Sequence, residues 1–263
     1  MSSRSLMQLF SLALLSCQGA GADAAGPDGA GADTVLDAAP DAPPPVFPEP
    51  DALPRFRFPV DEDDRMYMAD APLLGVDHDP EEHPDDRTNC LSHRGDGFPF
   101  CYDGHRGTDF LLRGAFERMD NGSAVVVAAA GGRVLEAVDG NYDRCHADLG
   151  SVDVDCDGFP ERANFVRIGH ANGYDSLYYH LKQGSVRVAV GQVVTCGEAL
   201  GLVGSSGRSA TPHLHFQVED PDDEVFDPYA GPASQETSLW VSQREVDGLP
   251  GGVCDPRWQV YPE

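Results

Sequence analysis

Two histidines stand one residue apart in the apolar segment TPHLHFQV, which spans residues 211–218. In an extended strand, residues i and i+2 point to the same face. His213 and His215 are therefore expected side by side, with Leu214 and Phe216 on the opposite face. Because neutral imidazoles are good zinc ligands, the pair is a candidate wall of a metal site.

A second group of candidate ligands lies much earlier in the chain, in the segment HRGTDF. It contains His105 and Asp109, and a turn through Gly107 can bring the two side chains together. With one histidine of the 213/215 pair, they give a His-Asp-His set. Three protein ligands with an open fourth position are typical of catalytic zinc, which makes a bound water acidic enough to supply hydroxide near neutral pH.

A zinc hydrolase also needs a base and a group that stabilises the developing oxyanion. The helical motif H-E-x-x-H is absent, so no motif glutamate is available. The remaining candidates are histidines: whichever of the 213/215 pair does not bind the metal, and His180, which ends the apolar run LYYHL.

Short β-type segments must position these residues. After residue 121 the chain consists of apolar runs that are broken by Gly, Asn and Asp, a pattern that predicts an antiparallel, mainly β domain with tight turns. The runs are SAVVVAAAGGRVLEAV, ANFVRIGHANGYDSLYYHL, SVRVAVGQVVTCGEALGLVGSSG and HLHFQVED.

The order of these motifs resembles that of the M23 metallopeptidases, the lysostaphin-type or LytM-type zinc endopeptidases of bacterial cell walls. The resemblance covers roughly residues 100–230 and is specific because several motifs occur together in order. They are HRGTDF, GSAVVVAAAGGRV, VRIGHANGYDSLYYHL, VAVGQVVTCGEALGLVGSSGRSATPHLHFQVE and DPY. The chain departs from the family pattern at Thr211, where a glycine often stands, and in a long Asp-rich insert before ANFVRI.

The resemblance implies an antiparallel sheet domain of the LytM/lysostaphin peptidase type, with a groove walled by loops. It implies one catalytic zinc held by His105, Asp109 and His215, with His213 as general base and His180 hydrogen-bonding the transition-state oxyanion. The implied substrate is a peptide of peptidoglycan. Two alternatives stay open: a non-catalytic regulator that binds another envelope hydrolase, and a zinc peptidase that acts on a protein.

The N-terminus predicts export. Residues 1–17 combine Arg4, a short apolar run and the sequence LLSC, which resembles the lipobox of bacterial lipoproteins and makes Cys17 the candidate lipidation site. Residues 18–58 are rich in Ala, Gly, Pro and Asp and are expected to form a disordered acidic linker. Residues 59–263 then form the peptidase domain, and the protein is expected in the cell envelope, anchored to a membrane through Cys17.

Composition excludes some partners and predicts disulfides. The formal net charge of the 263-residue chain is −26, and Lys182 is its only lysine. This balance argues against nucleic acid as a partner. Six cysteines follow Cys17, an even number that predicts three disulfides in an exported chain. Pairing between sequence neighbours gives Cys90–Cys101, Cys145–Cys156 and Cys196–Cys254.

The Asp-rich insert contains Asp153, Asp155 and Asp157, spaced like the opening of a calcium loop. Glu161 stands at position nine of that loop, and Asn164 occupies the position where a bidentate glutamate is usual. We therefore treat these four acids as candidate ligands of a structural Ca²⁺. The other histidines are expected at the surface or in turns: His78, His83, His93, His146 and His170.

Overall fold

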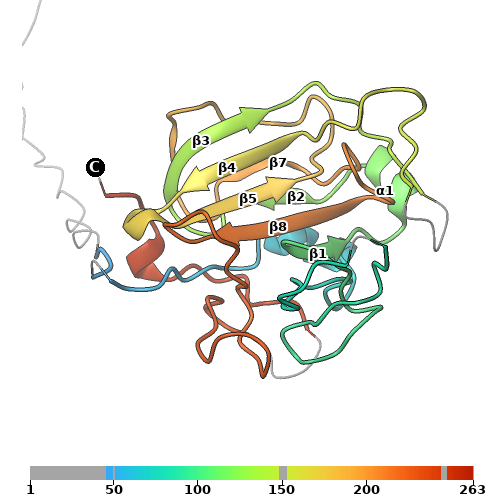
Figure 1. Cartoon of the computed structure of the whole chain (residues 1–263). Coiled ribbons are helices and arrows are strands. Elements are labelled where there is room, and N and C mark those ends of the chain that lie inside the picture. Colours follow the sequence, from blue (N-terminus) through green and yellow to red (C-terminus); the bar gives the residue numbers. More distant parts are fainter. Residues whose placement is uncertain (1–45, 50, 84, 148–152, 244–247, 263) are drawn as a thin grey trace, which may run out of the picture. The chain divides into compact units, whose positions relative to one another are not determined.

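A computed structural model of the chain describes residues 46–49, 51–83, 85–147, 153–243 and 248–262 (Figure 1). The predicted signal peptide, Cys17 and most of the predicted linker lie outside these residues. Within the described part, no helix is both long enough and apolar enough to cross a lipid bilayer.

The described chain is mainly β, as the sequence predicted. A six-stranded antiparallel sheet has the strand order β1-β8-β5-β4-β3-β6, and a two-stranded antiparallel sheet pairs β2 with β7 (Figure 1). The strands are β1 (Thr108–Leu111), β2 (Val125–Val127), β3 (Gly132–Val138), β4 (Phe165–Gly169), β5 (Asp175–Tyr179), β6 (Val193–Val194), β7 (Ala199–Leu202) and β8 (His213–Glu219). The helices are short: α1 (Ala115–Asp120) and the 3-10 turns η1 (Glu62–Tyr67), η2 (Ala171–Gly173) and η3 (Pro256–Trp258).

Strand β8 shows the alternation that its sequence predicts. Leu214, Phe216 and Val218 point into the core and are at most 1% exposed. His213 and His215 belong to the opposite face, which is the polar face of the sheet. Strand β8 lies between β1 and β5, so its polar face adjoins residues from both neighbours.

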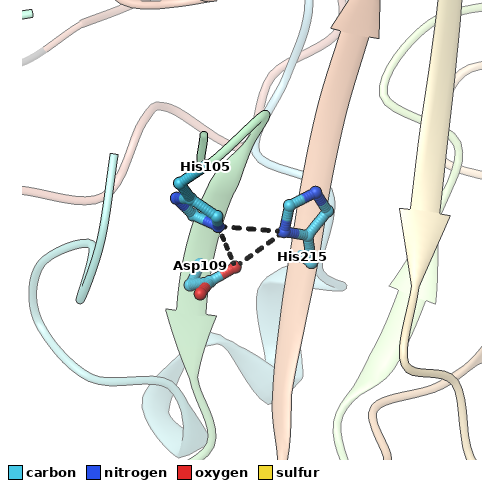
Figure 2. Close-up of side chains that lie close together, drawn as sticks. All are labelled: His105, Asp109 and His215. Carbon is cyan, nitrogen blue, oxygen red and sulfur yellow. Dashed lines mark hydrogen bonds and ion pairs between the residues drawn. The ribbon is translucent and has the colours of Figure 1, made fainter. Parts of the chain in front are cut away.

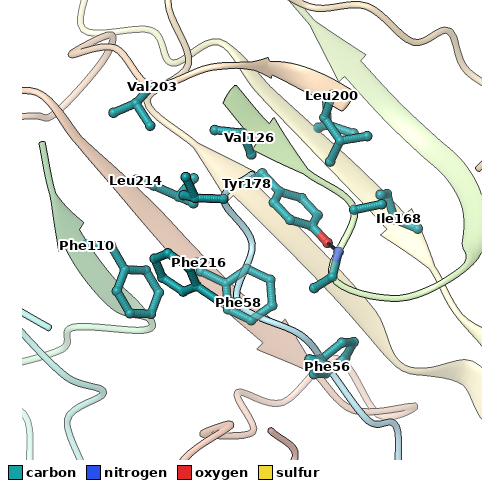
Figure 3. Packing of buried hydrophobic residues seen from close by; sticks show 14 of the residues in the cluster. Phe56, Phe58, Phe110, Val126, Ile168, Tyr178, Leu200, Val203, Leu214 and Phe216 are labelled. Atoms are coloured by element: carbon teal, nitrogen blue, oxygen red, sulfur yellow. Dashed lines mark hydrogen bonds between the residues drawn. The ribbon is translucent and has the colours of Figure 1, made fainter. Parts of the chain in front are cut away.

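The hydrophobic core fills the space between the two sheets (Figure 3). Val126 of β2 and Leu200 of β7 face Tyr178 and Phe216 of the large sheet, and all four are fully buried. Burial of such apolar surface is the main term that favours folding. The large sheet therefore has a dry face toward the core and a polar face on which chemistry can take place.

The predicted boundary between linker and domain at residue 58 is wrong. Phe56 and Phe58 are fully buried in the core (Figure 3), and the backbone N–H of Phe56 donates to Leu239 O at 2.7 Å. Phe58 N–H likewise donates to Gly251 O at 2.7 Å. The folded domain thus begins before Phe56, because two aromatic side chains in an otherwise polar segment find core partners.

All three predicted disulfides are present: Cys90–Cys101, Cys145–Cys156 and Cys196–Cys254. The first two each join residues that are 11 positions apart, whereas the third joins residues 58 positions apart. Local pairing was therefore the right guide for the two short loops, and the remaining pair followed.

His170 is buried, which corrects its predicted place at the surface. Its ring Nδ1 lies 2.9 Å from Gly131 O and its Nε2 lies 2.7 Å from Ser176 Oγ. Ser176 Oγ lies 3.0 Å from the hydroxyl of Tyr178, which in turn accepts the backbone N–H of Ala129 at 2.8 Å. Nδ1 must donate to the carbonyl, so Nε2 accepts and the ring is neutral. Burial lowers the pKa of His170 to about 4.

This histidine should make stability depend on pH. The unfolded chain takes up a proton near the ordinary value of 6.5, whereas the folded chain resists it down to about pH 4. The free energy of unfolding should therefore fall as pH drops between these values, by a total of ~3 kcal/mol from this group. Urea unfolding at pH 7 and pH 4.5 should show that His170→Gln has lost most of this dependence. The exposed His146 provides the control, because His146→Gln should keep the wild-type dependence.

Candidate active site

Three predicted ligands converge on the polar face of the large sheet (Figure 2). Asp109 of β1 stands directly opposite His215 of β8 in the strand register, and His105 lies in the loop before β1. Asp109 Oδ1 lies 2.9 Å from His215 Nδ1 and 3.3 Å from His105 Nε2, and these two nitrogens are 3.2 Å apart. Among the described residues, these three form the one group of His, Cys, Asp or Glu side chains that could hold a metal ion.

Hydrogen bonds outside the cluster assign the histidine tautomers. His105 Nδ1 lies 2.7 Å from Gly75 O and must donate to it, so its lone pair is on Nε2. His215 Nε2 lies 3.3 Å from Gln217 Oε1, and when it donates there the lone pair is on Nδ1, the atom 2.9 Å from Asp109 Oδ1. The three inward atoms, two imidazole nitrogens and a carboxylate oxygen, therefore present lone pairs to one another. A bound cation relieves that repulsion.

The spacing of the donors fits zinc. In a tetrahedral site with ligands about 2.0–2.1 Å from the metal, neighbouring ligand atoms are about 3.3 Å apart. The three observed separations of 2.9, 3.2 and 3.3 Å agree with that edge. A set of two imidazoles and one carboxylate suits zinc better than calcium or magnesium, which take oxygen ligands. Three protein ligands also leave one tetrahedral position open.

The charge of the site is held by Asp109, which is only 4% exposed. Burial by itself would raise the pKa of Asp109, but the neighbouring His105 and His213 outweigh burial and lower the pKa well below its usual value. The carboxylate therefore stays ionised at neutral pH and provides the negative charge that a divalent cation requires.

His213 and His180 stand beside the ligands with similar hydrogen bonds. His213 Nδ1 lies 2.7 Å from Thr211 O, and His180 Nδ1 lies 2.7 Å from Ser206 O. Each ring therefore donates through Nδ1 and keeps a free lone pair on Nε2. The ring centroids are 4.6 Å apart, and His213 Nε2 lies 3.5 Å from Asp109 Oδ1. Burial would lower the pKa of His213, but Asp109 outweighs burial and raises it, so His213 takes up a proton more readily than His180.

The backbone at His180 turns sharply just after β5 ends at Tyr179. His180 has φ of +64°, in the left-handed region that non-glycine residues rarely adopt. Burial lowers the pKa of His180 well below its usual value, and the neighbouring His213 and His215 lower it further. The ring is therefore neutral near pH 7.

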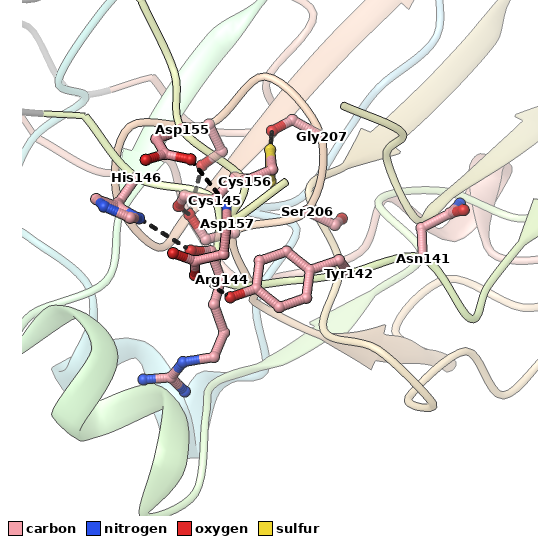
Figure 4. Close-up of a disulfide and its surroundings, with 12 residues drawn as sticks. Asn141, Tyr142, Arg144, Cys145, His146, Asp155, Cys156, Asp157, Ser206 and Gly207 are labelled. Carbon is pink, nitrogen blue, oxygen red and sulfur yellow. Dashed lines mark hydrogen bonds between the residues drawn. A yellow bond between two sulfur atoms is a disulfide. The ribbon is translucent and has the colours of Figure 1, made fainter. Parts of the chain in front are cut away.

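A disulfide loop supports the segment that orients His180 (Figure 4). Cys145 and Ser205 exchange two hydrogen bonds, with Cys145 N–H donating to Ser205 O at 3.0 Å and Ser205 Oγ donating to Cys145 O at 2.7 Å. Cys156 Sγ lies 3.7 Å from Gly207 O. Ser206, whose carbonyl accepts from His180, lies between these two anchored positions.

The other short disulfide supports His105. Phe100, next to Cys101, accepts the backbone N–H of Gly75 at 2.8 Å, and the carbonyl of that glycine accepts from His105 Nδ1. The ring of Tyr102 packs on His105 with centroids 4.5 Å apart. Each short disulfide therefore lies beside a loop whose backbone carbonyl orients a site histidine.

Gly107 is required by space and not by backbone conformation. A Cβ at this position would lie 2.5 Å from His215 Nε2 and 2.8 Å from Phe216 O. The side chain of His215 therefore occupies the volume that any other residue at 107 would need. This contact explains the glycine between the two candidate ligands of HRGTDF.

The predicted calcium site is not supported. Asp153, Asp155, Asp157 and Glu161 are all described, and they form no group that could hold a metal. Asp155 Oδ1 instead accepts the backbone N–H of Asp157 at 2.8 Å, and the carboxylate of Asp157 accepts the hydroxyl of Tyr142 (Figure 4). The aspartates shape a turn of the insert and do not gather around a common point.

Sequence reasoning missed Gln217 and Glu219, which continue the polar face of β8 beyond His215. Both are buried, at 7% and 8% exposure. The signal was present in the sequence, because the period of two that placed His213 and His215 on one face places Gln217 and Glu219 on that face as well.

Comparisons with known proteins agree with the geometry. Residues 103–228 match the model of peptidase family M23. A 60-residue segment is 52% identical to the DD-carboxypeptidase/endopeptidase Mpg of Neisseria meningitidis serogroup B, and a 59-residue segment is 41% identical to the peptidoglycan DD-endopeptidase ShyA of Vibrio cholerae. These segments are 21% and 22% of this chain but only 12% and 13% of the relatives.

Among solved structures, a zinc-containing peptidase from Vibrio cholerae is 23% identical, with a TM-score of 0.39 and coverage of 66% of this chain and 39% of that one. The family match includes all five residues that the sequence singled out for metal binding and proton transfer. Over residues 103–228, the chain is therefore similar to the members of peptidase family M23.

Proposed function

We propose that this protein is a zinc-dependent endopeptidase that hydrolyses peptide bonds of bacterial peptidoglycan. The observation that carries the proposal is the convergence of three lone pairs, from His105, Asp109 and His215, at the spacing of a tetrahedral zinc site. When bound there, zinc would polarise the scissile carbonyl and acidify a water molecule.

The residues around the ligands supply proton transfer. His213 Nε2 carries a free lone pair and lies within 3.5 Å of a ligand oxygen, so it is placed to take a proton from an attacking water. The protonated ring then becomes a donor and returns that proton to the leaving amine. This assignment gives His213 the role of general base and then of general acid.

His180 can stabilise an oxyanion only when its Nε2 carries a hydrogen. Its neutral ring donates to Ser206 O through Nδ1, so Nε2 lacks the hydrogen that an oxyanion needs. The rings of His180 and His213 are adjacent, at 4.6 Å between centroids. We therefore propose that the proton taken from water in each turnover is shared by His213 and His180. The ring that holds this proton donates to the oxyanion or to the leaving amine.

The substrate class is supported by the relatives. One matched relative is named a peptidoglycan DD-endopeptidase, and the matched segment includes only 13% of that protein. A wall substrate agrees with an envelope location, for which we propose export and a lipid anchor at Cys17, outside the described residues.

The test is digestion of purified sacculi by the purified chain, with new peptide termini identified by mass spectrometry. Release of muropeptides that stops with a chelator and returns with Zn²⁺ is the expected result. Hydrolysis of protein substrates alone would replace the wall with a protein target. Bound zinc without any hydrolysis would show that the fold serves as a regulator of another hydrolase.

A further inference from the structure

The metal ligand His215 is the first member of a line of polar side chains along β8. On the same face of the strand follow Gln217 and Glu219, both buried. Burying an amide and a carboxylate is costly unless each is hydrogen-bonded. Their partners therefore indicate what the two residues do.

The donors and acceptors of His215, Gln217 and Glu219 fit together in one arrangement. Gln217 Nε2 donates to Glu219 Oε1 at 2.7 Å, and Gln217 Oε1 lies 3.3 Å from His215 Nε2. A carboxylate accepts and does not donate, so Glu219 requires the NH₂ of Gln217 on its side. The amide oxygen must then face His215, whose Nε2 must carry the hydrogen.

Two arginines hold Glu219 in place. Arg167 Nη2 lies 3.1 Å from Glu219 Oε2, and Arg106 Nη2 lies 3.5 Å from Glu219 Oε1. Arg167 also pairs with Asp175, whose Oδ2 is 2.6 Å from its Nε. The carboxylate of Glu219 thus has an arginine at each oxygen and also accepts from the amide of Gln217 at Oε1.

The reversed amide would prevent metal binding. If Gln217 turned its NH₂ toward His215, its oxygen would face the carboxylate of Glu219, which is repulsive. His215 Nε2 would then have to accept, and the hydrogen would move to Nδ1, the atom that faces Asp109 and His105. A protonated Nδ1 cannot bind a metal.

We propose that Gln217 and Glu219 are positioning residues that fix the metal-binding tautomer of His215. The proposal rests on the zinc site described above. The arginines hold the carboxylate of Glu219, and Glu219 fixes the orientation of the Gln217 amide. That amide accepts the hydrogen of His215 Nε2 and so leaves the lone pair of Nδ1 for the metal. Such outer partners commonly change metal affinity by about 10- to 100-fold.

The test compares zinc affinities, measured by chelator competition, for the full chain and four variants. Glu219→Gln keeps the size of the side chain but lets the amide of Gln217 turn, so zinc affinity should fall by about tenfold. Gln217→Met removes both hydrogen bonds and should cost about 10- to 100-fold. In the double variant the Glu219 change should add less than about twofold, because its effect passes through Gln217.

Asp175→Asn is the matched control. It removes a carboxylate that pairs with the same Arg167 guanidinium but makes no contact with Gln217, so zinc affinity should stay unchanged. In metal-free protein, ¹⁵N chemical shifts should show a larger share of the Nε2–H tautomer of His215 in the wild type than in Gln217→Met, because only the wild type has the Gln217 acceptor beside Nε2.

The results distinguish a wrong proposed function from a wrong positioning role. If the wild type binds no zinc, the proposed function is wrong. If it binds zinc and Glu219→Gln binds it equally well, or if the two substitutions act additively, the positioning role is wrong. An unchanged tautomer in Gln217→Met would also overturn it.

Discussion

Asp109→Asn should abolish stoichiometric zinc binding and lower peptidase activity by at least ~10⁴-fold, because the acidified water is lost with the metal. Asparagine has nearly the shape of aspartate but no negative charge. Its NH₂ group can also donate to the lone pairs on His105 Nε2 and His215 Nδ1, which would occupy the atoms that bind the metal. Equilibrium dialysis with zinc analysis and the muropeptide assay measure the two effects.

A second buried aspartate gives the control for this substitution. Asp227 is 2% exposed and its Oδ2 lies 2.9 Å from His78 Nε2, outside the metal cluster. Asp227→Asn should therefore retain zinc and most of the activity. Equal zinc content in Asp109→Asn and the wild type would show that Asp109 is not a ligand.

His213→Ala should have the second largest effect and should separate metal binding from proton transfer. The three ligands remain, so the variant should bind one zinc. The general base is lost, so kcat should fall by about 10²- to 10⁴-fold. Steady-state kinetics on a defined stem peptide, together with zinc analysis of the same sample, would measure both quantities.

Added imidazole provides a check on this role. Removal of the His213 ring leaves a space beside Asp109, and free imidazole that enters it should restore part of the activity. If His213→Ala lost its zinc together with its activity, the ring would be a ligand and not the base. Full activity in this variant would place the base elsewhere.

The sequence could point to the candidate ligands because their information is local. The alternation in HLHFQV determines which residues share a face of β8, and HRGTDF brings His105 and Asp109 within one turn. The choice between His213 and His215 could not be made from periodicity, because both share a face. The strand register distinguishes the two histidines, since His215 lies opposite Asp109 whereas His213 lies opposite Leu111.

Other features depend on the tertiary structure and had no sequence signal. The carbonyls of Gly75, Ser206 and Thr211 orient three site histidines, and any residue type provides a carbonyl. For the Asp-rich insert the sequence signal was misleading, because the spacing imitates a calcium loop while Asp155 and Asp157 accept hydrogen bonds from the backbone of the insert and from Tyr142. Phe56 and Phe58 were obscured because a composition averaged over a long acidic segment hides two aromatic side chains.

We expect the two short disulfide loops to make the geometry of the site depend on redox conditions. Each lies beside a loop whose carbonyl orients a site histidine, Gly75 for His105 and Ser206 for His180. The core cluster between the sheets contains none of these cysteines. We therefore expect a chain with reduced cysteines to keep its sheets while these two loops become more mobile.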